Sequence, residues 1–241
     1  MTARVTHSAT DMPGFKAVLF DMDGVILDSE PIHERALQVA LRSYKIEIPA
    51  SASPLFRGLT EKEICRMVVK RWGAGLVDAD TLMDAKFAAY AELSQEVELI
   101  PGMLELIEFM HRREWPLGLV TSAAKKDQVR AFQRFGLGKY FPMVVTAADI
   151  RHPKPNPQPY QFAASRMNAR PADCLVIEDS KYGVASAAAA GCTVIGFTSS
   201  FGARELTQVG AHRTFKSASE ILQYLCGDVK LSPESADSGQ P

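Results

Sequence analysis

Two aspartates follow an apolar run near the start of the chain, in the segment Val18-Leu19-Phe20-Asp21-Met22-Asp23-Gly24-Val25. Side chains at positions i and i+2 of a strand point to the same side, so this spacing delivers two carboxylates together. Such like charges are costly unless a cation or a shared proton relieves them. One carboxylate can then attack as a nucleophile while the other transfers a proton. The alternative interpretation is a strand end whose aspartates only cap a turn.

Two further segments carry groups that bind anions. Thr121 and Ser122 follow the apolar run 117–120 and precede an expected helix. Hydroxyls and free N–H groups at a helix start can bind phosphate, and an ordinary N-cap is the alternative. Lys154 stands in a loop with four prolines between 153 and 159, which stiffen the backbone around it. A fixed ammonium there could neutralise a phosphoryl group; an ordinary surface lysine is the alternative.

A second pair of carboxylates, Glu178 and Asp179, ends the apolar run 175–177. If Asp21, Asp23 and Asp179 converge on one edge of a sheet, their oxygens form a hard-ligand site that suits Mg²⁺. For Glu178 and Asp179 the alternative role is capping of the helix that follows.

The elements that must position these residues alternate along the chain. Apolar runs rich in strand-forming residues occupy 17–20, 117–120, 143–146, 175–177 and 193–197, and helical patterns occupy 104–113, 126–135, 160–167 and 183–190. This alternation predicts an α/β fold with a Rossmann-like parallel sheet that is covered by helices on both faces.

One segment interrupts the alternation with helical periodicity alone. The patterns at 32–44, 61–72 and 80–94 each predict a helix, and Thr60 with Glu63 predicts a capping box for the second. We therefore expect a small helical cap domain (31–96) inserted into an α/β core (15–30 and 97–228). An insertion at this point lies above the carboxyl ends of the strands, where open α/β sheets bind ligands.

The composition excludes several classes of function. The 241 residues are 46% hydrophobic and 23% charged, which is ordinary for a globular protein, and the net charge of -1 offers no field for nucleic acid or an anionic membrane. No run approaches the length of a membrane span, and residues 1–14 lack the apolar core of a signal peptide. Four scattered cysteines without a C-x-x-C pair indicate reduced thiols. We expect a cytoplasmic protein, a monomer by default, with flexible termini (1–14 and 229–241) and no nucleic-acid or membrane partner.

The motifs at the ends of the expected strands, in their order along the chain, resemble those of the haloacid dehalogenase-like hydrolases. The resemblance covers about residues 15–224. The matching segments are Asp21-Met22-Asp23-Gly24-Val25, Thr121-Ser122, Lys154-Pro155 and Glu178-Asp179-Ser180. The position of the helical insertion resembles the members with a helical cap. Segment 20–31 is especially similar to the branch of sugar-phosphate phosphatases and β-phosphoglucomutases.

The resemblance implies a Mg²⁺-dependent phosphatase of small phosphorylated metabolites, with sugar phosphates as the expected substrates. It implies that Asp21 attacks phosphorus to form an aspartyl phosphate, and that Asp23 acts as general acid and then as general base. It also implies that Mg²⁺ lies between Asp21, the backbone carbonyl of Asp23, and Asp179. Glu178 either completes the metal shell or orients Lys154.

The resemblance further implies that Thr121 and the N–H of Ser122 hold phosphate oxygens, while Lys154 neutralises the remaining charge. The residue at the position of Asp23 distinguishes the branches of the family. Dehalogenases resemble this pattern without the second aspartate, and phosphonate-cleaving members carry a different residue there. The presence of Asp23 therefore favours phosphoryl transfer.

Candidate substrate-binding residues of the cap are Arg57, Gly58, Thr60, His33 and Lys86. The first three lie in a segment that resembles the cap loop which dips toward the active site in related enzymes. For Arg57 and Lys86 the alternative is a solvated charge on a helix face. For His33 the alternatives are a partly buried structural histidine and a hinge residue, as in the mutase, that couples cap closure to acid–base chemistry.

Two alternative functions remain at this point. A phosphoglucomutase would use the same aspartyl phosphate, but the mutase carries an arginine where this chain has Glu61, which would repel a second phosphate. A non-catalytic binding protein on this fold would be expected to have lost a catalytic carboxylate or the lysine, and this sequence retains them.

Overall fold

The protein is described by a computed structural model that covers residues 14–56, 60–73 and 75–227. Its centre is a six-stranded parallel sheet with the strand order β5-β4-β1-β6-β7-β8. The strands of this sheet are β1 (Ala17–Phe20), β4 (Leu117–Val120), β5 (Met143–Val145), β6 (Cys174–Glu178), β7 (Thr193–Phe197) and β8 (Arg213–Phe215).

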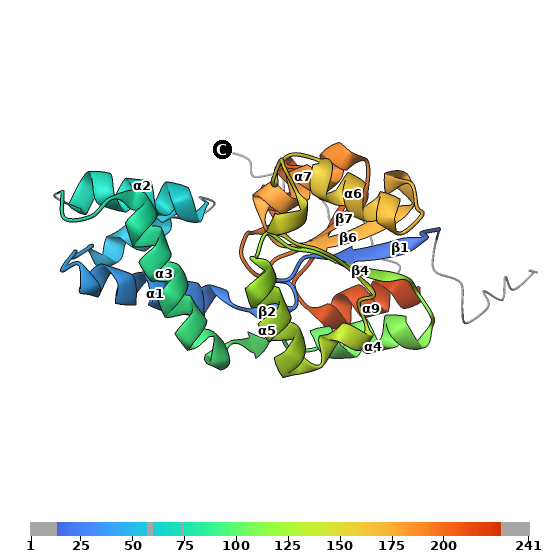
Figure 1. Cartoon of the computed structure of the whole chain (residues 1–241). Helices are drawn as coiled ribbons and strands as arrows, with labels where there is room; N and C mark the ends of the chain where they lie inside the picture. Colours follow the sequence, from blue (N-terminus) through green and yellow to red (C-terminus); the bar gives the residue numbers. More distant parts are fainter. Residues whose placement is uncertain (1–13, 57–59, 74, 228–241) are drawn as a thin grey trace, which may run out of the picture.

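Helices cover both faces of this sheet (Figure 1). The helices α4 (Met103–Arg112), α5 (Lys125–Phe135) and α9 (Ala218–Cys226) lie on one face, and α6 (Gln158–Arg166), α7 (Lys181–Ala190) and α8 (Ala203–Gln208) lie on the other. Short 3-10 turns occupy Ala50–Phe56, Ser94–Glu96, Leu137–Lys139, Ala147–Asp149 and Pro171–Asp173.

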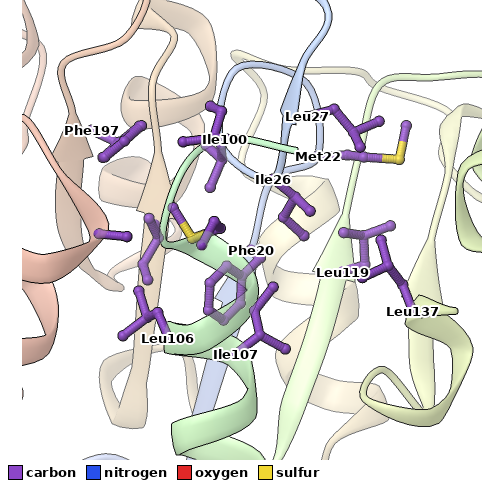
Figure 2. Close-up of a cluster of buried hydrophobic side chains, with 14 of the residues drawn as sticks. Phe20, Met22, Ile26, Leu27, Ile100, Leu106, Ile107, Leu119, Leu137 and Phe197 are labelled. Atoms are coloured by element: carbon purple, nitrogen blue, oxygen red, sulfur yellow. The ribbon is translucent and has the colours of Figure 1, made fainter. Parts of the chain in front are cut away.

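Strand β1 shows why the sheet is buried on both sides. Its four residues are all apolar and none is exposed to solvent. Because successive side chains point to opposite faces, Val18 and Phe20 join the cluster under α4 and α9, whereas Ala17 and Leu19 join the cluster under α6 and α7. Figure 2 shows Phe20 in the first of these clusters, with Ile107 of α4.

The helical insertion consists of α1 (Glu30–Ser43), α2 (Glu61–Trp72) and α3 (Ala79–Leu93), which lie to one side of the sheet (Figure 1). It has an apolar cluster of its own, formed by Leu37, Ala40, Leu41, Ile46, Cys65, Val68 and Leu82. The chain enters and leaves it through a two-stranded antiparallel ribbon, β2 (Leu27–Asp28) with β3 (Glu98–Leu99). The expected capping box starts α2: Thr60 N–H donates to Glu63 at 2.7 Å, and Glu63 N–H donates to Thr60 at 3.3 Å.

The predicted α/β fold with a helical insertion is confirmed, and each predicted strand and helix corresponds to an observed one within a few residues. The sequence patterns did not predict β2, β3, β8, α8 and α9, all but the last of which have six residues or fewer. The termini expected to be flexible, apart from Gly14, lie outside the described residues. Among the described helices, none has the length and apolar run that crossing a membrane requires.

Candidate active site

A cleft of about 1440 Å³ lies between the helical insertion and the carboxyl ends of the central strands. The described candidate residues that line it are Asp21, Asp23, Thr121, Ser122, Lys154 and Asp179 from the core and His33, Thr60 and Lys86 from the insertion. Glu178 lies beneath them with no exposed surface. Arg57 and Gly58 fall outside the described residues, so their roles stay predictions.

Lys154 joins two of the candidate carboxylates. Its Nζ donates to Asp21 Oδ1 at 2.6 Å, to Glu178 Oε1 at 2.7 Å and to the carbonyl oxygen of Val120 at 3.0 Å. Its side chain is only 6% exposed, so the alternative of an ordinary surface lysine is wrong. Burial lowers the pKa of Lys154, but the charges of Asp21 and Glu178 outweigh it and raise the pKa well above its ordinary value. The two carboxylates therefore favour the charged form of Lys154.

Both carboxylate oxygens of Glu178 have partners. Oε1 accepts from Lys154 and, at 3.1 Å, from the hydroxyl of Tyr160; Oε2 accepts from the N–H (2.9 Å) and the hydroxyl (3.0 Å) of Ser180. A Cβ at Gly183 would overlap this carboxylate, so α7 packs directly against it. The hydroxyl of Ser180 accepts from the N–H of Gly183 and caps α7. The alternative that Glu178 and Asp179 cap this helix is therefore wrong.

Asp179 is held between two segments. Its Oδ2 accepts from the hydroxyl of Ser200, and the hydroxyl of Ser199 lies 3.4 Å from the same oxygen. Ser199 also donates to the carbonyl oxygen of Gly24 at 2.5 Å. Gly24 has φ +76°, and a Cβ there would overlap the carboxylate of Asp179. The turn after the first motif therefore needs glycine for its backbone angle and for its close approach to Asp179.

Asp23 connects the core with the insertion. It lines the cleft, and its Oδ1 accepts from the hydroxyl of Ser29 at 2.7 Å. Ser29 is fully buried and occupies the N-cap position of α1. The candidate acid and base is thus bound to the residue from which the first helix of the insertion starts.

Thr121 and Ser122 lie in the turn between β4 and α5. Thr121 is buried, and its hydroxyl oxygen accepts from the N–H of Ala123 at 2.9 Å; Ser122 is exposed beside it. The N-cap of α5 is Ala124, so the alternative that either hydroxyl is an ordinary N-cap is wrong.

Asp21, Glu178 and Asp179 form a group that could hold a metal ion, because each offers one oxygen within 4.8 Å of the others. Burial raises the pKa of Asp21 to about 7, although Lys154 lowers it. Burial, and then the charges of Glu178 and Asp21, raise the pKa of Asp179 well above its ordinary value. A divalent cation would relieve this repulsion, and carboxylate oxygens suit Mg²⁺. The carboxylate of Asp23 is not part of the group; its backbone carbonyl stays the predicted ligand.

The candidates on the insertion side form a charged cluster. Lys86 is ion-paired with Glu61, and its side chain is only 3% exposed, so the alternative of a solvated helix-face charge is wrong. His33 is partly buried: its ring stacks on Tyr90 at a centroid distance of 4.1 Å, and its Nδ1 lies 3.7 Å from Glu61 Oε1. These contacts bring α1, α2 and α3 together at the cleft.

Sequence reasoning missed several residues that contact the candidate site: Ser29, Tyr160, Ser199 and Ser200. Tyr160 carried a weak signal, because it closes the proline-rich segment that begins beside Lys154. Ser29 lies in segment 20–31 with its partner Asp23, but the resemblance gave it no role. Ser199 and Ser200 carried no signal, because their partners come from other segments of the chain.

Comparisons with known proteins agree with this geometry. The model of the haloacid dehalogenase-like hydrolase family matches residues 18–197. A phosphorylated carbohydrates phosphatase of Thermotoga maritima is 31% identical over 180 residues, which are 73% of this chain and 82% of that protein. Fructose-1-phosphate phosphatase YqaB of Escherichia coli is 29% identical over 181 residues, 75% of this chain and 95% of that protein.

A solved structure extends the likeness to the whole fold. A candidate beta-phosphoglucomutase from Thermotoga maritima superimposes with a TM-score of 0.75 and 27% identity, over 89% of this chain and 100% of that chain. The sequence match spans three quarters of the chain and includes the four strand-end motifs that meet at the cleft. This chain therefore belongs to the haloacid dehalogenase-like hydrolase family.

Proposed function

We propose that the protein is a Mg²⁺-dependent phosphatase of small phosphorylated metabolites, with sugar phosphates as its substrates. The observation that carries this proposal is the buried Lys154, whose Nζ binds both Asp21 and Glu178 beside Asp179. Such an arrangement offers a carboxylate nucleophile, a fixed cation and a set of oxygen ligands in one place. The names of the two sequence relatives support phosphorylated sugars as the substrate class.

In the first step a carboxylate oxygen of Asp21 attacks phosphorus, the bond to the leaving alcohol breaks, and an aspartyl phosphate forms. Asp23 donates its proton to the leaving oxygen. Lys154 neutralises the phosphoryl oxygens, which Thr121 and the N–H of Ser122 also bind.

In the second step water attacks the aspartyl phosphate. Asp23 is now a carboxylate and accepts the proton of the water, phosphate leaves, and the carboxylate of Asp21 is regenerated. Ser29 donates to Asp23 and orients it for both proton transfers.

Mg²⁺ bound by Asp21, Asp179 and the backbone carbonyl of Asp23 would screen the repulsion between the attacking carboxylate and the phosphoryl dianion. Of the two roles open for Glu178, its contacts favour the orientation of Lys154, because both its oxygens already accept hydrogen bonds. The cap domain (31–96), with Thr60, His33, Lys86, Arg57 and Gly58, would bind the leaving group.

The test is phosphate release from a panel of phosphorylated sugars, with Mg²⁺ and with EDTA. We expect release that requires the metal, and we expect Asp21→Asn to lower kcat by at least about 10³-fold because an amide cannot attack. Thermal unfolding of the variant should match that of the wild type. Release that persists in the folded variant would remove Asp21 as the nucleophile, and release that persists in EDTA would remove the metal.

A mutase is the second candidate, favoured by the structural similarity to the candidate beta-phosphoglucomutase. It predicts conversion of glucose 1-phosphate that depends on a sugar bisphosphate, with slow net release of phosphate. We favour the phosphatase because Glu61 is paired with Lys86, which leaves neither side chain free to bind a second phosphate.

A further inference from the structure

A buried ion pair lies in the wall that the insertion contributes to the cleft. Lys86 binds Oε2 of Glu61, and the side chains of these two residues are 3% and 32% exposed. Oε1 of the same carboxylate faces Nδ1 of His33 at 3.7 Å. The pair is neutral as a unit. Both residues line the cleft, and the side chain of Glu61 is more exposed there than that of Lys86.

This pair lies close to the groups that handle the leaving alcohol. Ser29 donates its hydroxyl to Asp23 and accepts the N–H of His33 at 2.9 Å through its carbonyl oxygen. One turn of α1, about 5 Å, therefore separates the residue that binds Asp23 from the residue that faces Glu61. The leaving group of a substrate at Asp21 would lie near the carboxylates of Glu30 and Glu61, which both line the cleft.

Other cations among the described residues of the cleft are paired or distant. Lys62 pairs with an aspartate of α3 at 3.2 Å, and Lys181 pairs with a glutamate of α8 at 2.8 Å. Arg42 lies in the last turn of α1, about 18 Å along the helix from its first turn. Lys154 is committed to the phosphoryl site. Three of these cations thus have a carboxylate partner, and the fourth lies toward the far end of α1.

We propose that the Glu61–Lys86 pair makes the insertion accept uncharged, hydroxyl-bearing leaving groups and reject phosphomonoesters that carry a second phosphate or a carboxylate. This inference rests on the proposed phosphatase function. A hydroxyl can donate to Glu61 without disturbing the pair. A second anion would meet the partly exposed carboxylate of Glu61. It could bind Lys86 only by displacing Glu61, which would leave the carboxylate of Glu61 unpaired in a partly buried position.

The first test uses matched substrates on the wild-type protein with Mg²⁺. One pair is fructose 1-phosphate and fructose 1,6-bisphosphate; the other is 2-hydroxyethyl phosphate and phosphoglycolate, which differ by a CH₂OH group in place of a carboxylate. We expect kcat/KM to be at least tenfold higher for the member with the neutral leaving group in each pair. Equal or faster hydrolysis of the doubly anionic members would overturn this inference alone. No release from any of the four would overturn the proposed function as well.

The second test changes the pair. Glu61→Gln leaves Lys86 without its anion, so the ratio of neutral to anionic kcat/KM should fall at least tenfold. Glu92→Gln is the control, because it removes the same charge from an exposed position of α3 that does not line the cleft. An unchanged ratio in Glu61→Gln, with a melting curve like that of the wild type, would contradict the proposal. If that variant does not fold, the wild-type comparison still decides.

Discussion

Asp179 shows how a hydrogen bond from one hydroxyl group opposes the rise in pKa that burial causes in a carboxyl group. Burial and the charges of Glu178 and Asp21 raise its pKa, whereas the hydrogen bond from Ser200 lowers it. A hydrogen bond to the ionised form favours that form. The hydrogen bond from Ser200 therefore offsets part of the rise in pKa, and it fixes the oxygen of Asp179 that it contacts.

We predict that Ser200→Ala weakens Mg²⁺ binding. Partners that orient a metal ligand typically contribute about 10- to 100-fold to metal affinity, so a loss in that range is expected. Calorimetric titration with Mg²⁺, together with the Mg²⁺-dependent rise in melting temperature, measures the effect without a substrate. Ser219→Ala, at an exposed position of α9, is the control. Unchanged affinity in Ser200→Ala would mean that Asp179 does not depend on this contact.

The strand-end residues of the site could be predicted from sequence because each follows an apolar run. The carboxyl ends of parallel strands meet at one edge, which brings Asp21, Thr121 and Asp179 together without further information. The ion pair of Glu61 with Lys86 could not be predicted, because it depends on how two helices of the insertion pack. Lys86 was a candidate because it is a charged residue of the insertion, and nothing in the sequence indicated that Glu61 neutralises it.

At the scale of elements, the approach of α7 to β6 decides the geometry of the site. Gly183 lies in the first turn of α7, where a side chain would occupy the position of the Glu178 carboxylate. The helix can then pack closely enough for Ser180 to bind Glu178 while capping the helix. Glycine here serves close approach rather than an unusual backbone angle.

We predict that Gly183→Ala destabilises the protein and inactivates it. Alanine gains about 1 kcal/mol in helix propensity. The new Cβ must displace Glu178 from Lys154, and breaking a buried ion pair costs about 3–5 kcal/mol. A net loss of at least about 2 kcal/mol in the free energy of unfolding should follow, with kcat lowered at least about 100-fold.

Urea denaturation and phosphate release measure the two effects. The matched control is Gly138→Ala, since a Cβ at that glycine would have no heavy atom within 4 Å. A Gly183→Ala protein that is more stable than the wild type would show that Glu178 can move at little cost, and that its contacts do not hold Lys154.

Element length accounts for part of what the sequence patterns missed, although β5, with three residues, was predicted and α9, with nine, was not. Runs of four buried apolar residues, 17–20 in β1 and 174–177 in β6, are detectable on their own. Strand β8 has three residues, and β2 and β3 have two each. The pairing of Leu27 with Leu99 depends on a partner on the far side of the insertion, which no local pattern reveals.

For the whole molecule, the separate apolar cluster of the insertion is the main feature. The core has two clusters, one on each face of its sheet, whereas α1, α2 and α3 enclose a smaller one. The two parts also share apolar contacts, because Ile32 and Ala36 of α1 and Ala89 and Tyr90 of α3 belong to one of the core clusters. Besides these residues and the ribbon of β2 and β3, Arg134 of α5 joins the two parts by donating to the carbonyl oxygen of Ser94 at 3.0 Å. A part with a cluster of its own can open with a free energy different from that of the core.

The reactivity of the cysteines can show whether the insertion and the core open with different free energies. Cys226 is exposed, whereas Cys65 lies in the cluster of the insertion and Cys174 and Cys192 lie in a core cluster. Burial raises the pKa of Cys65 and Cys174 to about 11 and that of Cys192 to about 12. We predict that one thiol reacts rapidly with a disulfide reagent in the native protein, and that Cys226→Ser abolishes this reaction.

Urea should then expose the buried thiols in order. Because the cluster around Cys65 is smaller, we expect Cys65 to become reactive at a lower urea concentration than Cys174 and Cys192, with mass spectrometry identifying the labelled residue. That order would support the division into a cap (31–96) and a core (15–30 and 97–228). If all three thiols became reactive together, the insertion and the core would unfold as one unit.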